Sequence, residues 1–437
     1  MKVLQWNQLD PAGRASALAR PQSSQSDELR QGVAAIIQRV REGGDEALAA
    51  LTEELDRAPA KTLKIDPSEL VAAEEALDES LRTALLDAVS RIRAFHSACM
   101  RRDASVATAV GVVCERIARP IQTVGLYVPA GSAPLPSTTL MLGVPAGLAG
   151  CANVVLCSPP NDQGDVDPTV LAAASLVGVK QAYCVGGAQA VAAMAYGTDT
   201  VPKCDKIFGP GNAWVTEAKT QVSLDPAGAA IDMPAGPSEV MVVVEDAGNA
   251  EFAAADLLAQ AEHGPDSQAI LVAFSEQHAR RVVDQVERQL QDLPRKDIAR
   301  QAISNSRAIV VSDREQALEV VNTYAAEHLI LQLKDARDFL GGVTAAGSVF
   351  LGDWTPESVG DYCSGTNHVL PTYGYARAHS GVSVDSFQTQ MTVQELTPRG
   401  LATLADTTTR LAEVEGLEAH ARAVSLRMSY LKRNGRV

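Results

Sequence analysis

The stretch TVGLYVPAGSAP at residues 123–134 decides the fold class, because an apolar, β-rich run passes directly into a loop of glycine and proline. Two further segments share this arrangement, VGGAQ at residues 185–189 and FGPGN at residues 208–212. Each follows an apolar run and precedes a helical pattern, which is the setting of nucleotide-binding crevices at the carboxyl ends of parallel strands. None completes the Gly-x-Gly-x-x-Gly pattern, and the chain has no Walker lysine motif. Spacing alone therefore leaves two interpretations open, a dinucleotide site or tight turns without a chemical role.

Short β-rich runs alternate with helical patterns from residue 121 onward, whereas residues 28–101 are expected to be helical with a break at Gly43 and Gly44. This alternation indicates an α/β protein with parallel sheets whose faces are covered by helices. The expected strands are 123–128, 153–157, 181–185, 240–244, 269–274 and 308–311.

Composition excludes several classes of function. The 437 residues exceed one compact core, so roughly two to four domains are expected. A net charge of -15 argues against nucleic acid or an anionic membrane as partner, because both require a cationic face. The N-terminus lacks a secretory signal, and the apolar run at 140–157 is interrupted by Pro145 and Asn153, so a helix followed by a buried strand is expected rather than a membrane span. We therefore expect a cytoplasmic protein.

The seven cysteines are scattered and include no Cys-x-x-Cys pair, which predicts reduced and mostly buried thiols.

Four of the seven histidines fall in polar clusters. In LLAQAEHGP at residues 257–265, Gln260 and His263 are three apart, so a helix would place both side chains on one face. Asp361 lies in a loop rich in glycine and serine, and His420 lies near the C-terminus. Two imidazoles, a carboxylate and an amide oxygen suit Zn²⁺ and also Mn²⁺ or Co²⁺. Isolated pairs of this kind are usually surface residues, and spacing cannot show that the four meet.

Glu327 and His328 are the candidate proton-transfer groups. Ser312 and Glu315 form a capping box that begins a helix ending near Tyr324, and residues 328–331 form the next strand. The pair thus lies at a helix-to-strand junction, where an imidazole can accept a proton and a carboxylate can activate water. The alternative is a structural histidine beside a surface glutamate.

Two other polar groups have weaker signals. Ser238 offers a hydroxyl in the loop 232–239, which is otherwise a simple turn. Cys363 follows Asp361 by two residues and is a possible nucleophile that holds an aldehyde, although no activating base lies beside it in sequence.

The C-terminal segment is predicted to be helical. Thr397 and Pro398 have the residue types of a helix start. Gly416 is placed to break the helix between Glu415 and His420, which leaves His420 in the first turn of the last helix. An apolar stripe of that helix is expected to be able to pack against a partner subunit; it comprises Leu417, Ala421, Val424, Met428 and Leu431.

Taken together, these segments closely resemble the histidinol dehydrogenase family from about residue 28 to residue 432. The most specific stretches are 125–134, 185–198, 206–219, 232–240, 257–265, 327–330, 347–374 and 391–396. The resemblance implies two incomplete Rossmann-like domains with small helical terminal pieces. The expected division is an extension at 1–27, a first domain of 28–126 with 240–382, a second, NAD-contacting domain at 127–239, and a C-terminal domain at 383–437.

The same resemblance implies the roles of individual residues. Zn²⁺, one ion per subunit, would be bound by Gln260, His263, Asp361 and His420. NAD would contact Tyr127, Gln189 and Asn212, and L-histidinol would contact Ser238, Glu327, His328, His368 and Glu415, with the four metal ligands also lining its site.

The implied reaction is the two-step oxidation of L-histidinol through L-histidinal to L-histidine, with His328 as base and Glu327 activating water. The implied assembly is a homodimer in which Glu415 and His420 reach the site of the neighbouring subunit. Two alternatives stay open, a zinc- and NAD-dependent dehydrogenase of another small primary alcohol, and a zinc hydrolase.

Overall fold

The structure is a computed structural model that describes residues 1–21, 27–59, 61–130 and 134–436. The end of the first glycine and proline loop, residues 131–133, lies outside the described residues. The chain forms two compact units, one of residues 1–99 with 121–387 and one of residues 100–120 with 388–437.

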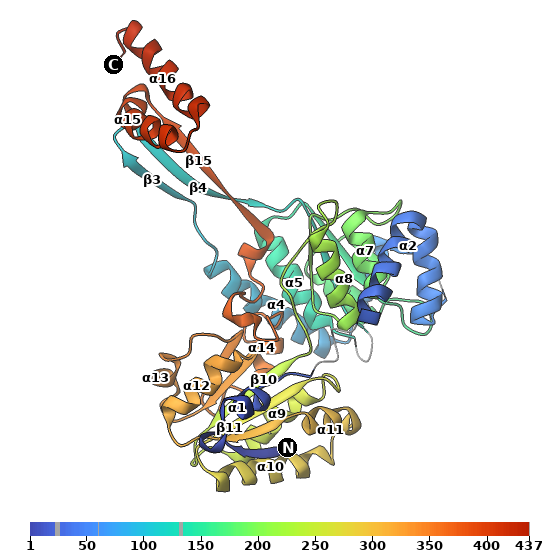
Figure 1. The fold of residues 1–437 in the computed structure, drawn as a ribbon. Coiled ribbons are helices and arrows are strands. Elements are labelled where there is room, and N and C mark those ends of the chain that lie inside the picture. The colour runs from blue at the N-terminus through green and yellow to red at the C-terminus, as the bar shows by residue number, and fades with distance from the viewer. Residues whose placement is uncertain (22–26, 60, 131–133, 437) are drawn as a thin grey trace. The chain divides into compact units, whose positions relative to one another are not determined.

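The first sheet of the larger unit contains six parallel strands in the order β1-β12-β11-β10-β13-β14. From β12 to β14 this is the order 3-2-1-4-5 of a Rossmann sheet. The strand from the N-terminus, β1, extends it at one edge (Figure 1). The strands are β1 (Lys2–Gln5), β10 (Glu239–Val244), β11 (Gln268–Ala273), β12 (Arg307–Val310), β13 (His328–Gln332) and β14 (Ser348–Leu351).

The second sheet has the order β2-β7-β6-β5-β8-β9, and its five strands from β7 to β9 are parallel in the same Rossmann order. A short antiparallel strand, β2, closes one edge. The strands are β2 (Lys64–Ile65), β5 (Thr123–Tyr127), β6 (Asn153–Ser158), β7 (Gln181–Cys184), β8 (Lys206–Phe208) and β9 (Ala230–Ile231). The expected pair of incomplete Rossmann-like sheets is confirmed.

Helices cover both faces of each sheet because successive strand residues point into different cores. In β10, Val240 and Val242 face α9 (Ala250–Ala261), α10 (Glu276–Leu290) and α11 (Lys296–Ser304), whereas Met241 and Val243 face α1 (Pro11–Ala17), α12 (Arg314–Tyr324) and α13 (Ala336–Leu340). The second sheet packs on α3 (Pro67–Glu75), α4 (Glu79–Ala98), α5 (Pro136–Ala149) and α6 (Pro168–Leu176) on one face, and on α2 (Asp27–Leu51), α7 (Gly187–Tyr196) and α8 (Ala213–Leu224) on the other. The short elements are η1 (Trp6–Gln8), η2 (Thr52–Asp56), α14 (Glu357–Tyr362), η3 (Tyr375–Arg377) and η4 (Val384–Phe387).

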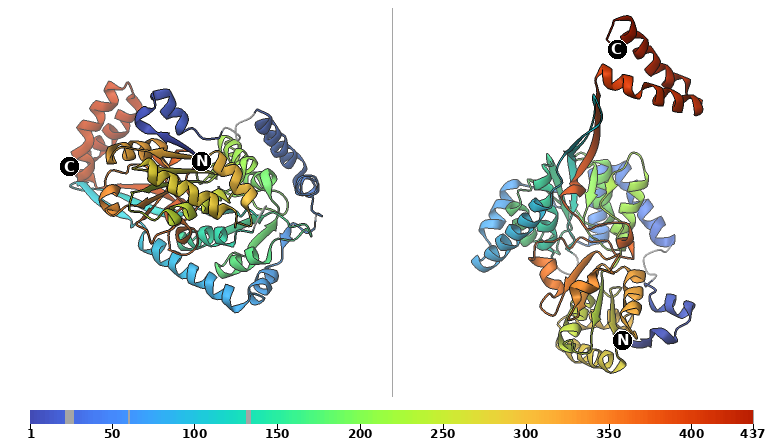
Figure 2. Two further views of the ribbon diagram at one scale, coloured as in Figure 1. Left: turned by 90° about the horizontal axis from the view of Figure 1, so that it is seen from below. Right: turned by 90° about the vertical axis from the view of Figure 1, so that its left-hand side faces the viewer.

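The smaller unit combines an antiparallel sheet, β15-β4-β3, with a helical hairpin (Figures 1 and 2). Its elements are β3 (Ala104–Ala109), β4 (Val112–Pro120), β15 (Gln388–Leu396), α15 (Pro398–Val414) and α16 (Glu418–Arg433). Thr397 caps α15 through its side chain and Pro398 occupies the first turn, as predicted. The sheet was not predicted from the sequence.

The domain boundaries differ from those expected. Residues 27–99 contain α2, α3 and α4, which pack on the second sheet, and β2, which is one of its strands. The next strand of this sheet, β5, pairs with β6 and β8. Residues 27–99 and β5 therefore belong with the second sheet and not with residues 240–382. The N-terminal residues form a strand of the first sheet rather than a separate extension. The smaller unit begins at Gln388 and recruits residues 100–120, because β4 pairs with β15 along its length.

Most predicted elements are confirmed, with three local corrections. The six strands lie within one residue of their expected bounds, and α2 bends at Gly44, whose φ is 49°. The cap of α12 is Asp313, which accepts from the N–H of Gln316, and not Ser312. Only three cysteines are buried (Cys157, Cys184 and Cys204), and all seven are free thiols. In α16 only Ala421 and Leu431 of the apolar stripe are buried, in a hairpin that also buries Ala405 and Ala412 of α15.

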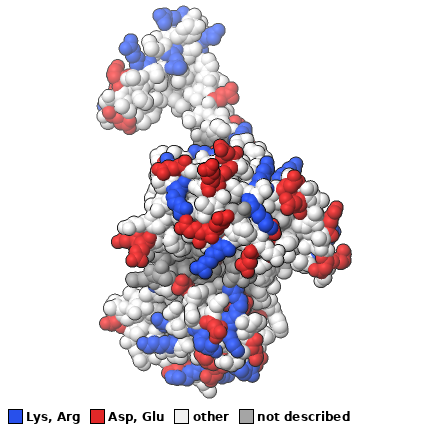
Figure 3. All heavy atoms as spheres, turned by 90° about the vertical axis from the view of Figure 1, so that its right-hand side faces the viewer, with Lys and Arg blue, Asp and Glu red and all other residues white. Residues whose placement is uncertain are grey.

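Acidic and basic side chains are interspersed over much of the face shown in Figure 3. None of the helices in the described part of the chain combines the length and apolar character needed to cross a membrane.

Candidate active site

The carboxyl edge of the second sheet gathers the three residues expected to contact NAD. Tyr127 ends β5, and its hydroxyl accepts a hydrogen bond of 3.1 Å from the N–H of Gly187 at the start of α7. Gly209, with φ of 119°, packs so closely on the Tyr127 carbonyl that a Cβ atom would lie 2.1 Å from its oxygen. Only glycine fits there, and the backbone of two loops therefore meets at the switch point between β5 and β8.

Gln189 and Asn212 lie on the two helices that leave this edge. Gln189 is buried in α7 and donates to Asp56 at 3.1 Å. Asn212 caps α8, where its side-chain oxygen accepts from the N–H groups of Trp214 and Val215. Both side chains thus have structural partners in the chain.

A group of metal-ligand type lies where α9 ends beside α14. One ligand atom each of His263, Glu357 and Asp361 lies within 4.8 Å of the others. The helix ends at Ala261, so His263 follows it in a turn. The prediction that His263 and Gln260 share one helical face is therefore wrong. An imidazole and two carboxylates suit a divalent cation, and the buried Asp361 Oδ1 makes an ion-pair contact of 3.3 Å with His328 Nε2 but no hydrogen bond within the described chain. These side chains fit a metal ion.

Gln260 adjoins this group through Glu357. In one orientation of its amide, Gln260 donates to the two carboxylate oxygens of Glu357 at 2.5 and 3.2 Å, and its oxygen accepts from the N–H of Glu239 at 3.3 Å. Binding of a metal ion by Gln260 requires the other orientation, with the amide oxygen toward Glu357 and the metal-ligand group. Both side chains are buried, and burial raises the pKa of Glu357 well above its usual range. Glu357 was missed in the sequence, although its spacing of four residues from Asp361 places both on one face of α14.

Glu327 and His328 lie at the amino end of β13, at the junction predicted for them. Ala325 ends α12 in the left-handed region, with φ of 54°, and turns the chain toward the strand. Glu327 Oε2 accepts from the N–H of Glu239 at 2.8 Å, and burial raises the pKa of Glu327 to about 8. The catalytic candidates therefore lie at the amino edge of their sheet, whereas the NAD candidates lie at the carboxyl edge of theirs.

His328 touches both the carboxylate pair and the metal-ligand group. Its Nδ1 lies 3.3 Å from the carbonyl oxygen of Glu239 and 3.7 Å from Glu327, and its Nε2 lies 3.3 Å from Asp361. Burial opposes the charged imidazolium, but the surrounding carboxylates, Glu357 foremost, outweigh burial and raise the pKa of His328 to about 10. The imidazole is thus held in a strongly acidic environment.

His368 and Ser238 border the same region. His368 is half-buried with Nε2 unpartnered among the described residues, and burial lowers its pKa while the charge of Asp361 raises it. Ser238 precedes Glu239 and accepts from the N–H of Gln268 through its carbonyl oxygen. The two residues thus lie in loops from two different parts of the chain, Ser238 directly before β10 and His368 after α14.

Glu415 and His420 belong to the smaller unit. Glu415 ends α15, Gly416 adopts φ of 70°, and His420 is the third residue of α16, as predicted. Both side chains are exposed. They flank one helix-to-helix turn.

Two Rossmann-type sheets, with a buried histidine and glutamate beside a group of metal-ligand type, are typical of an α/β oxidoreductase. A family model described as histidinol dehydrogenase matches residues 18–428. The chain belongs to the histidinol dehydrogenase family.

Individual relatives agree over the whole length. Histidinol dehydrogenase of Xanthomonas euvesicatoria is 56% identical, with 98% of this chain and 99% of the relative covered. The enzyme of Vibrio parahaemolyticus is 51% identical, with 99% and 100% covered. The crystal structure of histidinol dehydrogenase from Elizabethkingia anophelis has a TM-score of 0.94 and 44% identity, with 99% of each chain covered.

Proposed function

We propose that the protein is an L-histidinol dehydrogenase that oxidises L-histidinol through L-histidinal to L-histidine with two molecules of NAD. The observation that carries the proposal is the contact of the buried Glu327–His328 pair with the group containing His263, Glu357 and Asp361. Detection of L-histidine by mass spectrometry after incubation with L-histidinol and NAD tests it. Oxidation of other small primary alcohols at equal rates, or hydrolysis without NADH, would favour the two alternatives.

The metal site is proposed to hold Zn²⁺ through Gln260, His263 and Asp361, with His420 of a neighbouring subunit. The mixed nitrogen and oxygen donors of this group support the assignment. Bound zinc would act mainly as a template that grips the imidazole and amino nitrogens of the substrate. Ser238, His368 and Glu415 are proposed to contact the remainder of L-histidinol.

The NAD site is proposed at the carboxyl edge of the second sheet, with contacts from Tyr127, Gln189 and Asn212. Its support is the switch point between β5 and β8, the usual location of such a cofactor in this type of sheet. The N-terminal ends of α7 and α8, where the helix dipole favours negative charge, suit a pyrophosphate.

The chemistry of the pair follows from its geometry. In the first step His328 would take the alcohol proton while hydride passes from carbon to NAD, which yields the aldehyde. Glu327 would remove a proton from water as it adds to the aldehyde carbon, and His328 would take the hydrate proton as the second hydride leaves. Since carboxylates raise the pKa of His328, neutralising them with a bound cation is expected to lower it toward that of a base at neutral pH.

We also infer a homodimer with a shared site. Four large apolar side chains on α15 and α16 are exposed in the single chain: Leu411, Val414, Leu426 and Tyr430. Such a patch is typical of an interface between subunits. Docking of this hairpin on a second copy would bring Glu415 and His420 to that copy's metal group.

A further inference from the structure

The peptide groups of Glu239 touch both members of the catalytic pair. Its N–H donates to Glu327 Oε2 at 2.8 Å, and its carbonyl oxygen lies 3.3 Å from His328 Nδ1. In the orientation of the Gln260 amide that turns its nitrogen toward Glu357, the Gln260 oxygen lies 3.3 Å from the same N–H. The backbone at the first residue of β10 therefore sets the position of both members of the pair.

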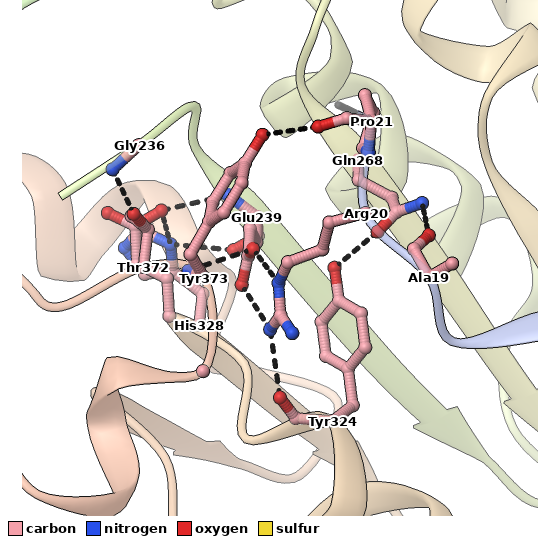
Figure 4. Close-up of polar contacts among 12 residues, drawn as sticks. Ala19, Arg20, Pro21, Gly236, Glu239, Gln268, Tyr324, His328, Thr372 and Tyr373 are labelled. Carbon is pink, nitrogen blue, oxygen red and sulfur yellow. Dashed lines mark hydrogen bonds and ion pairs between the residues drawn. The ribbon is translucent and has the colours of Figure 1, made fainter. Parts of the chain in front are cut away.

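The side chain of Glu239 is fixed in turn by Arg20 (Figure 4). The carboxylate is 1% exposed, and the guanidinium grips both of its oxygens, with Nη2 2.9 Å from Oε2 and Nε bonded to Oε1. The N–H of Tyr373 donates to Oε1 at 3.0 Å. A bidentate arginine restricts a carboxylate in both distance and orientation.

Arg20 also holds the other end of the catalytic junction. Its Nη2 donates to the carbonyl oxygen of Tyr324 at 2.8 Å, and its guanidinium carbon lies 4.0 Å from the centre of the Tyr324 ring. Tyr324 is the last residue of α12, three residues before Glu327, and its hydroxyl donates to Gln268 at the start of β11. One guanidinium thus joins the start of β10 to the turn that leads into β13.

We propose that Arg20 is a positioning residue for the oxidation of L-histidinol, acting through Glu239 and Tyr324 on Glu327 and His328. The inference rests on the proposed function of this pair. Arg20 does not contact the pair itself in any hydrogen bond of the described chain, so its effect is transmitted through the backbone. The alternative is that this buried ion pair only stabilises the fold. In that case, replacing Arg20 would lower the stability of the protein, but the enzyme that remains folded would turn over normally.

The first test compares Arg20→Met with Arg14→Met, which removes a partly exposed arginine of the same N-terminal segment, paired with Glu319 at 3.0 Å. With saturating NAD and zinc, kcat of Arg20→Met should fall about 10- to 100-fold while KM for L-histidinol changes less than about threefold, since small misplacements of reacting groups cost rate. Arg14→Met should keep kcat. A folded Arg20→Met enzyme with kcat within about twofold of wild type would overturn the proposal.

Two further variants keep the test decisive if Arg20→Met does not fold. Lysine at position 20 retains the charge but cannot form the fork to Glu239 and also reach Tyr324. Arg20→Lys should therefore stay folded with reduced kcat, and unchanged kcat would contradict the inference. In Arg20→Ala, millimolar guanidinium should restore part of kcat, whereas it should not restore His328→Asn.

A readout independent of activity separates this inference from the proposed function. Amide hydrogen exchange of the peptide containing Glu239 should accelerate in Arg20→Lys and remain unchanged in Arg14→Met. If wild-type protein forms no NADH from L-histidinol, the proposed function fails. Exchange at Glu239 then still decides whether Arg20 fixes this backbone, and unchanged exchange would overturn the positioning role.

Discussion

His328 Nε2 and Asp361 Oδ1 lie 3.3 Å apart, so the proposed base and a proposed metal ligand are direct neighbours. The two residues come from different elements, the amino end of β13 and the last turn of α14. Their contact would join the proposed proton transfer to the proposed metal binding. A substitution of either residue can therefore affect both proton transfer and metal binding. Turnover and bound zinc must both be measured to tell the two effects apart.

Replacing His328 tests the base. His328→Asn should lower kcat by about two to four orders of magnitude, the usual contribution of a general base, while zinc content stays near wild type. Steady-state NADH formation and metal analysis of the same preparation measure both quantities. Near-normal turnover would exclude the role.

Replacing Glu327 tests the activation of water. Glu327→Gln should impair the oxidation of supplied L-histidinal more than the first hydride transfer, because only aldehyde hydration needs that carboxylate. Glutamine keeps an oxygen to accept from the N–H of Glu239. Single-turnover measurement of each half-reaction distinguishes them, and equal losses would argue against the assignment.

Replacing Glu357 tests its link to the metal group. Glu357→Ala removes one carboxylate of the metal-ligand group, and loss of such a neighbour of the ligands typically lowers metal affinity about 10- to 100-fold. Competition with a chromogenic zinc chelator gives the affinity. Glu262→Gln, a carboxylate next to His263 but outside the group, is the matched control and should bind zinc normally. Equal affinity in all three proteins would remove Glu357 from the site.

Mixed dimers test the shared site. His328→Asn and His420→Asn should each be nearly inactive as homodimers, but a heterodimer of the two would contain one site with both histidines intact. Random reassembly of equal amounts should recover about a quarter of wild-type activity, since half of the dimers are mixed and half of their sites are intact. No recovery, with mixed dimers shown by native mass spectrometry, would place each site within one chain.

The sequence predicted the local elements well because each carries its own signal. The strand at 123–127 is apolar, Thr397 and Pro398 begin α15, and Gly416 separates α15 from α16. These features depend on backbone conformation and burial within a few residues. The junction at Glu327 and His328 was predictable for the same reason.

Features that depend on pairing between distant segments were missed. The strand order assigns β5 to the second sheet through β6 and β8, and β1 and β4 find their partners more than 250 residues away. Arg20 and Glu239 are likewise 219 residues apart. Nothing in the sequence around either residue marks the other as its partner. Charged residues are usually exposed, so the sequence does not show that these two are largely buried.

The most direct test of the central claim is the number of NADH molecules formed per L-histidinol consumed, with zinc-loaded protein and with protein stripped by a chelator. We predict two NADH per L-histidinol, lost on stripping and restored by zinc. One NADH per substrate, with L-histidinal released, or undiminished activity after complete removal of the metal, would contradict a four-electron oxidation at a metal-assisted site.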